Sequence, residues 1–122
     1  MTHMHHDHSG GLTRVNDQGE LVSKYSNAKI IVNDVEWYEM RNPNNRTRGT
    51  YLRENWEPIQ DQVTTFSEYI NVIPEIQMIH TSGHSNGHSI ILLKQGKDTM
   101  IHIGGLDVIT CSSKSSLGSS SR

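Results

Sequence analysis

The chain has 122 residues and a formal net charge of −2, and 33% of its residues are hydrophobic. This length fits one small domain, and the near-balanced charge argues against nucleic acid or an anionic membrane surface as the main partner. No stretch approaches the roughly 20 apolar residues of a membrane span, and no apolar run near the start suggests a signal peptide. The single cysteine, Cys111, has no partner for an internal disulfide, which favours a reducing cytoplasm.

The first half of the chain predicts one strand and two helical segments. Residues 29–32 form an apolar run rich in β-branched side chains, which predicts a buried strand. Asn33, with Glu36 three residues later, is an N-cap signature for a helix that follows the strand. Residues 51–62 predict a second helical segment, which Pro58 should kink or split.

The second half predicts short antiparallel strands, over residues 69–72, 76–79, 89–94 and 99–103. Residues 95–98 are a good hairpin connection between the last two strands. From residue 112 the composition becomes mostly serine, which predicts a disordered tail. We therefore expect one domain over residues 1–104, followed by a serine-rich tail over residues 105–122.

Histidine is concentrated in two short segments, of which the first reads HMHHDH over residues 3–8. In an extended backbone alternate side chains point to the same side, so His3 and His5 can chelate one ion together. Asp7 and His8 come next and can turn toward a second ion. Imidazole and carboxylate ligands suit zinc, iron, cobalt or manganese.

The second segment reads HTSGHSNGH over residues 80–88. Its glycines, Gly83 and Gly87, and its small polar residues disfavour a helix and favour a loop between strands. Such a loop can bring His84 back to the ion held by His3 and His5. Three imidazoles with one open position are the arrangement of a catalytic zinc site.

Plainer explanations of these residues remain open. An engineered tag would be an uninterrupted histidine run. A solvated histidine-rich loop would explain the first segment, but it would not explain a second, glycine-flanked one. His6 is the unspecified position of the first motif and is expected beside the ligands, whereas His80 and His102 fit structural or surface positions in strands. Trp37 and Trp56 fit a core more often than a substrate platform.

The two histidine motifs, H-x-H-x-D-H and T-x-G-H-x-x-G-H, resemble the metallo-β-lactamase superfamily. Four longer stretches resemble its quorum-quenching, lactonase-like branch from bacilli: THMHHDHSGGLTRV, NAKIIVNDVEWYEMRNPN, YLRENWEPIQDQV and EIQMIHTSGHSNGHSIILL. The resemblance covers most of the chain. It implies an α/β fold, as part of the family's four-layer αβ/βα sandwich, and the activity of a zinc-dependent hydrolase.

The resemblance also implies a role for each histidine of the motifs. His3, His5 and His84 would hold one zinc ion, and Asp7 and His8 would belong to a second. Asp7 would also act in catalysis by hydrogen bonding the bridging hydroxide, and His88 would orient the loop rather than bind metal. In the family, two ions lower the pKa of the bridging water and deliver hydroxide to the carbonyl of a small-molecule lactone or ester.

Three parts of the family pattern are absent: the strands before the first motif, a metal-bridging aspartate directly after Gly104, and the C-terminal half with its last histidine ligand. Gly105 stands at the aspartate position, and Asp107 lies two positions late. When residues 105–119 are back-translated with permitted codons and shifted by one base, they read DLMSSLAHQNPLWV, which restores the aspartate. We therefore expect an inserted base near the Gly104 codon, and Met1 to be an internal methionine of a longer ancestral chain.

These gaps leave different classes of function open. One is a lactonase-like hydrolase, and another is a truncated, non-catalytic remnant that binds at most one metal ion, since incomplete surroundings weaken a metal site. A third is a module that carries or senses metal without catalysis. Half a sandwich would also expose sheet faces, so we expect self-association through exposed strands.

Overall fold

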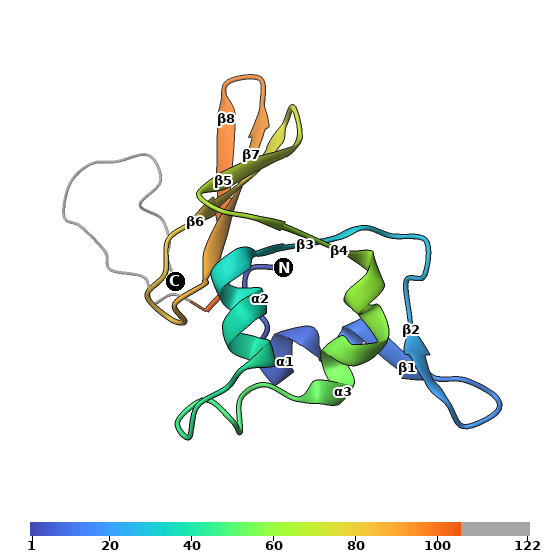
Figure 1. Ribbon diagram of the computed structural model, residues 1–122. Helices are drawn as coiled ribbons and strands as arrows, with labels where there is room; N and C mark the ends of the chain where they lie inside the picture. The colour runs from blue at the N-terminus through green and yellow to red at the C-terminus, as the bar shows by residue number, and fades with distance from the viewer. Residues whose placement is uncertain (106–122) are drawn as a thin grey trace.

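The computed structural model describes residues 1–105, and its expected mixed α/β class is confirmed (Figure 1). The expectations for residues 106–122, including the serine-rich tail and Asp107, lie outside the described residues. In chain order the elements are α1 (His6–Ser9), η1 (Gly10–Leu12), β1 (Thr13–Val15), β2 (Leu21–Ser23), β3 (Ile30–Asn33), α2 (Asp34–Arg41), α3 (Arg53–Trp56), η2 (Glu57–Gln62), β4 (Val63–Phe66), β5 (Tyr69–Ile73), β6 (Ile76–His80), β7 (Ser89–Gln95) and β8 (Asp98–His102).

The strands of the described residues form three sheets. β5, β6, β7 and β8 form an antiparallel sheet in chain order, as the sequence predicts. β1 and β2 form a small antiparallel hairpin, and β3 pairs with β4 in parallel, with Ile30 opposite Val63. The sequence analysis missed β1, β2 and β4. The parallel pair needs a crossover connection, which α2, α3 and η2 supply.

The two predicted helical segments are both present. The side chain of Asn33 caps α2 by accepting the Val35 N–H at 2.9 Å, and its amide donates to the Ser67 carbonyl at 2.7 Å, which ties the start of the helix to the end of β4. As expected, the segment containing Pro58 is split, into α3 and the 3-10 helix η2. The described residues contain no helix with the length and apolar character needed to cross a membrane.

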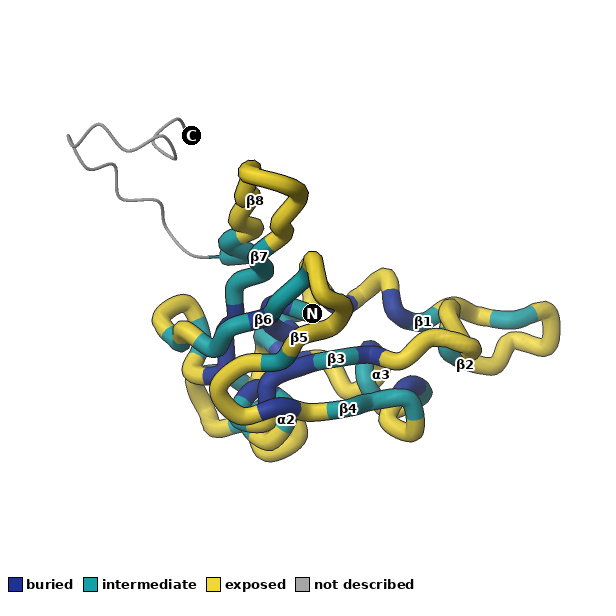
Figure 2. The backbone as a smooth tube through the Cα atoms, turned by 90° about the horizontal axis from the view of Figure 1, so that it is seen from above, coloured by how far each residue is buried: buried dark blue, intermediate teal, exposed yellow. Residues whose placement is uncertain are grey.

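The core lies where β3 and α2 meet the first residues of the chain, and Figure 2 shows buried backbone concentrated there. Its buried members are Met4, Leu12, Ile30, Val32, Met40, Tyr51 and Ile59. Trp37 and Trp56 pack against this core with their ring centroids 5.9 Å apart, which confirms their expected place. The first residues are therefore part of the packed interior, and this position decides where the first histidine motif lies.

Candidate metal centre

The extended segment before α1 positions His3 and His5. His3 is fully buried and His5 is half-buried. The backbone on either side of His3 is fixed, because the Thr2 carbonyl accepts the Ser89 N–H at 2.8 Å and the Met4 N–H donates to the Glu36 carboxylate at 2.7 Å. The rings of His3 and His5 lie with their centroids 4.7 Å apart, so the alternation expected of an extended backbone places both on the same side.

The loop between β6 and β7 brings His84 to the same place. The expected loop conformation is confirmed, since residues 81–88 form neither helix nor strand. Ser82 and Gly83 have positive φ angles of 56° and 99°, and this sharp turn precedes His84. The His84 ring centroid lies 4.9 Å from that of His3 and 4.8 Å from that of His5.

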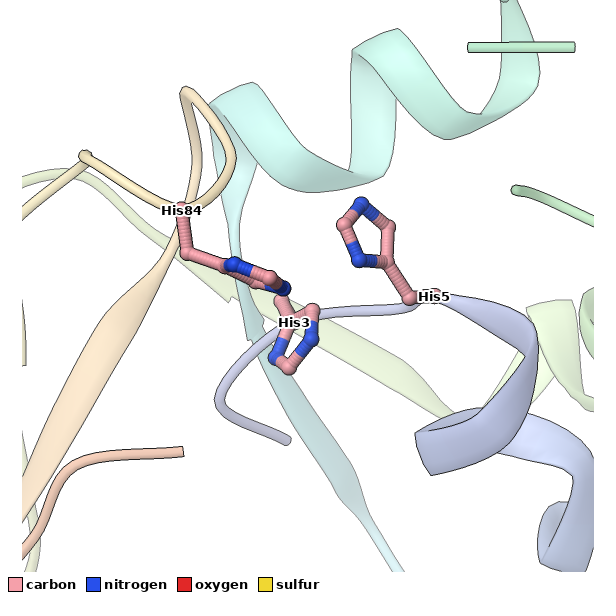
Figure 3. Close-up of side chains that lie close together, drawn as sticks. All are labelled: His3, His5 and His84. Atoms are coloured by element: carbon pink, nitrogen blue, oxygen red, sulfur yellow. The ribbon is translucent and has the colours of Figure 1, made fainter. Parts of the chain in front are cut away.

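These three side chains form a group that fits a metal ion (Figure 3). One ligand nitrogen from each of His3, His5 and His84 lies within 4.8 Å of the others. His3 Nδ1 lies 3.0 Å from Thr2 Oγ1, whereas His3 Nε2 is buried and has no hydrogen-bond partner among residues 1–105. A buried polar atom without a partner is costly, and a coordinated ion would satisfy it. Three convergent imidazoles are a suitable donor set for a transition metal.

The surroundings hold the buried imidazoles neutral, which is the form that binds metal. Burial, followed by the neighbouring His8 and His5, lowers the pKa of His3 to about 3. Burial also lowers the pKa of His5, although the Glu36 carboxylate opposes this shift. At neutral pH His3 and His5 therefore present lone pairs rather than positive charges.

Asp7 and His8 lie at the solvent side of this group, on α1. Both are exposed, and His8 Nε2 lies 3.6 Å from Asp7 Oδ2. The His8 ring is also close to that of His3, with their centroids 4.2 Å apart. The structure thus brings His8 beside the group, while the Asp7 carboxylate faces His8. The assignment of this pair to a second ion stays a prediction.

His88 is fully buried beside the group and is bonded to protein atoms on both sides of its ring. Its Nε2 accepts the Gly105 N–H at 3.1 Å, and its Nδ1 lies 3.3 Å from Thr81 Oγ1. Burial and the nearby His84 lower its pKa to about 4. These contacts join the loop between β6 and β7 (residues 81–88, the histidine loop) to the residues after β8. A residue that orients this loop needs such a geometry. The role of His88 stays a prediction.

Gly104 and Gly105 pass close to the histidines. A Cβ atom at Gly104, where φ is +60°, would lie 2.7 Å from both His88 Nε2 and Thr2 Oγ1. A Cβ atom at Gly105 would lie 2.6 Å from His84 Nε2. A side chain at position 105 would therefore enter the group of imidazoles, at the place where the family resemblance expects an aspartate.

The other singled-out histidines do not join the group. His6 is exposed, and its backbone N–H donates to the Thr50 carbonyl. His80 Nε2 lies 2.7 Å from the Asn86 carbonyl oxygen, and His102 is exposed at the end of β8.

The sequence analysis missed Glu36 as a site residue. Its place in an N-cap signature was the available signal, and that signal does not reveal that the carboxylate reaches the histidine-bearing segments.

We expect the metal-free protein to lose stability as the pH falls from 7 to 5. The pKa values of His3 and His88 lie below their usual value in the folded state, so the unfolded chain binds more protons in this range. The stability that each neutral ring contributes is complete above about pH 6.5 and is lost as the pH falls toward the folded pKa. At pH 5 the loss is about 2 kcal/mol for each ring.

Urea denaturation at several pH values measures this effect. His88→Asn should reduce the slope of the unfolding free energy against pH, because it removes one of the groups whose pKa is lowered in the folded state. A free energy of unfolding that stays flat between pH 7 and 5 in the unsubstituted chain would contradict the expected neutral burial of both rings.

Comparisons with known proteins agree with the fold. The chain is 30% identical over 100 residues to an N-acyl homoserine lactonase from Bacillus cereus, a match that spans 82% of this chain and 34% of the lactonase. A "probable metal-dependent hydrolase" from Staphylococcus aureus superposes with a TM-score of 0.77 at 36% identity, over 85% of this chain and 36% of that one. No family model matches the chain.

Two further solved structures extend the comparison. An N-acyl homoserine lactone hydrolase with the product N-hexanoyl-L-homoserine at its catalytic metal centre superposes with a TM-score of 0.54 at 25% identity, over 75% of this chain and 30% of that one. A hydrolase of the β-lactamase superfamily shares the fold, with a TM-score of 0.64 at 22% identity, over 84% and 38%. The chain spans about a third of the length of these proteins. This chain is therefore similar in sequence to an N-acyl homoserine lactonase, shares its fold with a hydrolase of the β-lactamase superfamily, and corresponds to part of these longer proteins.

Proposed function

We propose that this chain binds one transition metal ion, with zinc as the expected ion, through His3, His5 and His84, in a site of the hydrolase type. The observation that carries this proposal is the convergence of three imidazoles, one with a buried Nε2 that has no other partner. When bound, such an ion supplies an activated water and polarises a substrate carbonyl. The protein's part is to hold three imidazole donors in place and leave one coordination position open.

We propose a small lactone or a related ester as the substrate class. The Bacillus cereus relative is an N-acyl homoserine lactonase, and a solved relative holds an opened homoserine product at its metal centre. In this chain Asp7 is exposed at the solvent side of the histidines. From there its carboxylate would orient the attacking water, and its partner His8 would extend the polar rim that receives a substrate.

Zinc titration with a lactone-opening assay tests this function. We expect one ion per chain and proton release on ring opening of an N-acyl homoserine lactone. His5→Ala should lower zinc affinity at least tenfold and abolish ring opening, since it removes one of three ligands. His102→Ala is the matched control, because this exposed histidine lies outside the group. An unchanged affinity in His5→Ala would refute the site.

A second candidate is a remnant that binds one ion without turnover. The observation in its favour is that residue 105, which lies directly beside the His84 ring, is a glycine and supplies no side-chain ligand. Under this candidate the frame of the gene changed near Gly104, and the lost residue at position 105 is a carboxylate. One ion bound without ring opening in the titration above would favour this candidate over the first.

The substitution Gly105→Asp tests this explanation. We expect it to tighten metal binding about tenfold and to raise the ratio of ions per chain above one, since it adds an oxygen ligand between the two histidine motifs. The exposed His84 ring would have to shift slightly, because the new Cβ lies 2.5 Å from its Cδ2. Gly105→Asn is the control of equal size without the charge. Equal metal binding by Gly105→Asp and the unsubstituted chain would contradict the explanation.

We also propose that the chain self-associates through β8. Among residues 1–105 this strand lies at the edge of its sheet, all five of its residues are exposed, and Met100 is 68% exposed. Unpaired edge strands favour such pairing. Met100→Lys should shift the sedimentation profile toward monomer, whereas Val15→Lys, at a valine on β1 that is 63% exposed, should leave it unchanged. A monodisperse monomer in the unsubstituted chain would refute this proposal.

A further inference from the structure

Glu36 places a fully buried carboxylate next to the metal site. It lies in the first turn of α2 and has no exposed surface. A carboxylate is stable in such a position only when its oxygens are hydrogen bonded. Oε2 accepts the Met4 N–H at 2.7 Å and the Tyr51 hydroxyl at 3.1 Å, and Oε1 accepts the Ser85 hydroxyl at 2.7 Å.

Each donor to Glu36 is a neighbour of a histidine of the group. Met4 separates His3 from His5, and Ser85 directly follows His84. The Tyr51 ring packs against the His5 ring with their centroids 5.3 Å apart. Burial and the Glu36 carboxylate raise the pKa of Tyr51, so its hydroxyl stays protonated and donates. One carboxylate is therefore bonded to both segments that carry the imidazoles.

The backbone of Glu36 makes a second contact with the histidine loop. A Cβ atom at Gly87 would overlap the backbone N and Cα of Glu36, so only glycine lets the loop pack this closely on α2. The loop is thus held against Glu36 twice, through Ser85 on one side of the turn and through Gly87 on the other. This arrangement leaves little freedom for His84 to move relative to α2.

We propose that Glu36 is a positioning residue that sets the distance between His84 and the pair His3 and His5, so that the affinity and geometry of metal coordination depend on its carboxylate. This proposal rests on the proposed metal site. It assigns Glu36 no contact with the ion. The carboxylate acts through the three neighbouring donors, and losing it would let the two histidine-bearing segments drift apart.

Cobalt(II) is a suitable probe, because its visible absorption spectrum reports coordination geometry as well as binding. Glu36→Gln keeps the size of the side chain, but it replaces one acceptor oxygen with an amide group that cannot accept the same bonds. We expect cobalt affinity to fall at least tenfold and the visible bands to shift. The matched control is Glu39→Gln, on the same helix, where a partly exposed carboxylate accepts from Asn86 of the same loop at 3.1 Å. Its affinity should stay within about twofold and its spectrum should be unchanged.

Two further variants keep the test decisive if Glu36→Gln fails to fold by circular dichroism. Tyr51→Phe and Ser85→Ala each remove one donor and leave the carboxylate in place, and each should lower cobalt affinity severalfold. Wild-type affinity and spectrum in the folded Glu36→Gln variant, or in both single-donor variants, would overturn the proposal while the metal site stands. If the unsubstituted chain does not bind cobalt, the proposed function fails first and this proposal fails with it.

Discussion

The packing of the first five residues into the interior is the constraint on which the rest of the site depends. Met4 is 1% exposed and belongs to the core, and the backbone around it is bonded to three different elements: β3 through Met1, β7 through Thr2, and α2 through Met4 itself. A segment held from three directions has a fixed register. His3 and His5 therefore face the histidine loop rather than solvent, and the site follows from the position of this segment.

The sequence predicted the antiparallel strands well because their signals are local. Alternating or β-branched runs and a short hairpin connection lie within a few residues of each other, and β6, β7 and β8 formed almost where expected. The parallel pair of β3 and β4 was missed, since it joins segments that are far apart and are connected through two helical segments. The two strands of the small β1–β2 hairpin have only three residues each, which is too short for an alternating pattern to be recognised.

The candidate site, too, has a part that local sequence signals predict and a part that only the fold reveals. The grouping of His3, His5 and His84 could be predicted because residue spacing within two short motifs encodes it, and metal-binding side chains such as imidazole are easily recognised in a sequence. The part played by Glu36 could not be predicted, because its three partners come from different regions of the chain and only the fold brings them together. Likewise, the residue types of Gly104 and Gly105 do not themselves reveal that both pass within contact distance of imidazoles, and only the family resemblance, which expects an aspartate at position 105, pointed to this place.

The three imidazoles differ in their access to water: His84 is exposed, His5 is half-buried and His3 is fully enclosed. A hydrated cation arriving from solvent would meet these donors in that order. It could shed its water shell one molecule at a time, exchanging each for a nitrogen at increasing depth, so that no step requires complete dehydration. This gradient would give the proposed metal site a direction of loading, with the exposed His84 ring as the point of capture and the buried His3 ring as the final anchor.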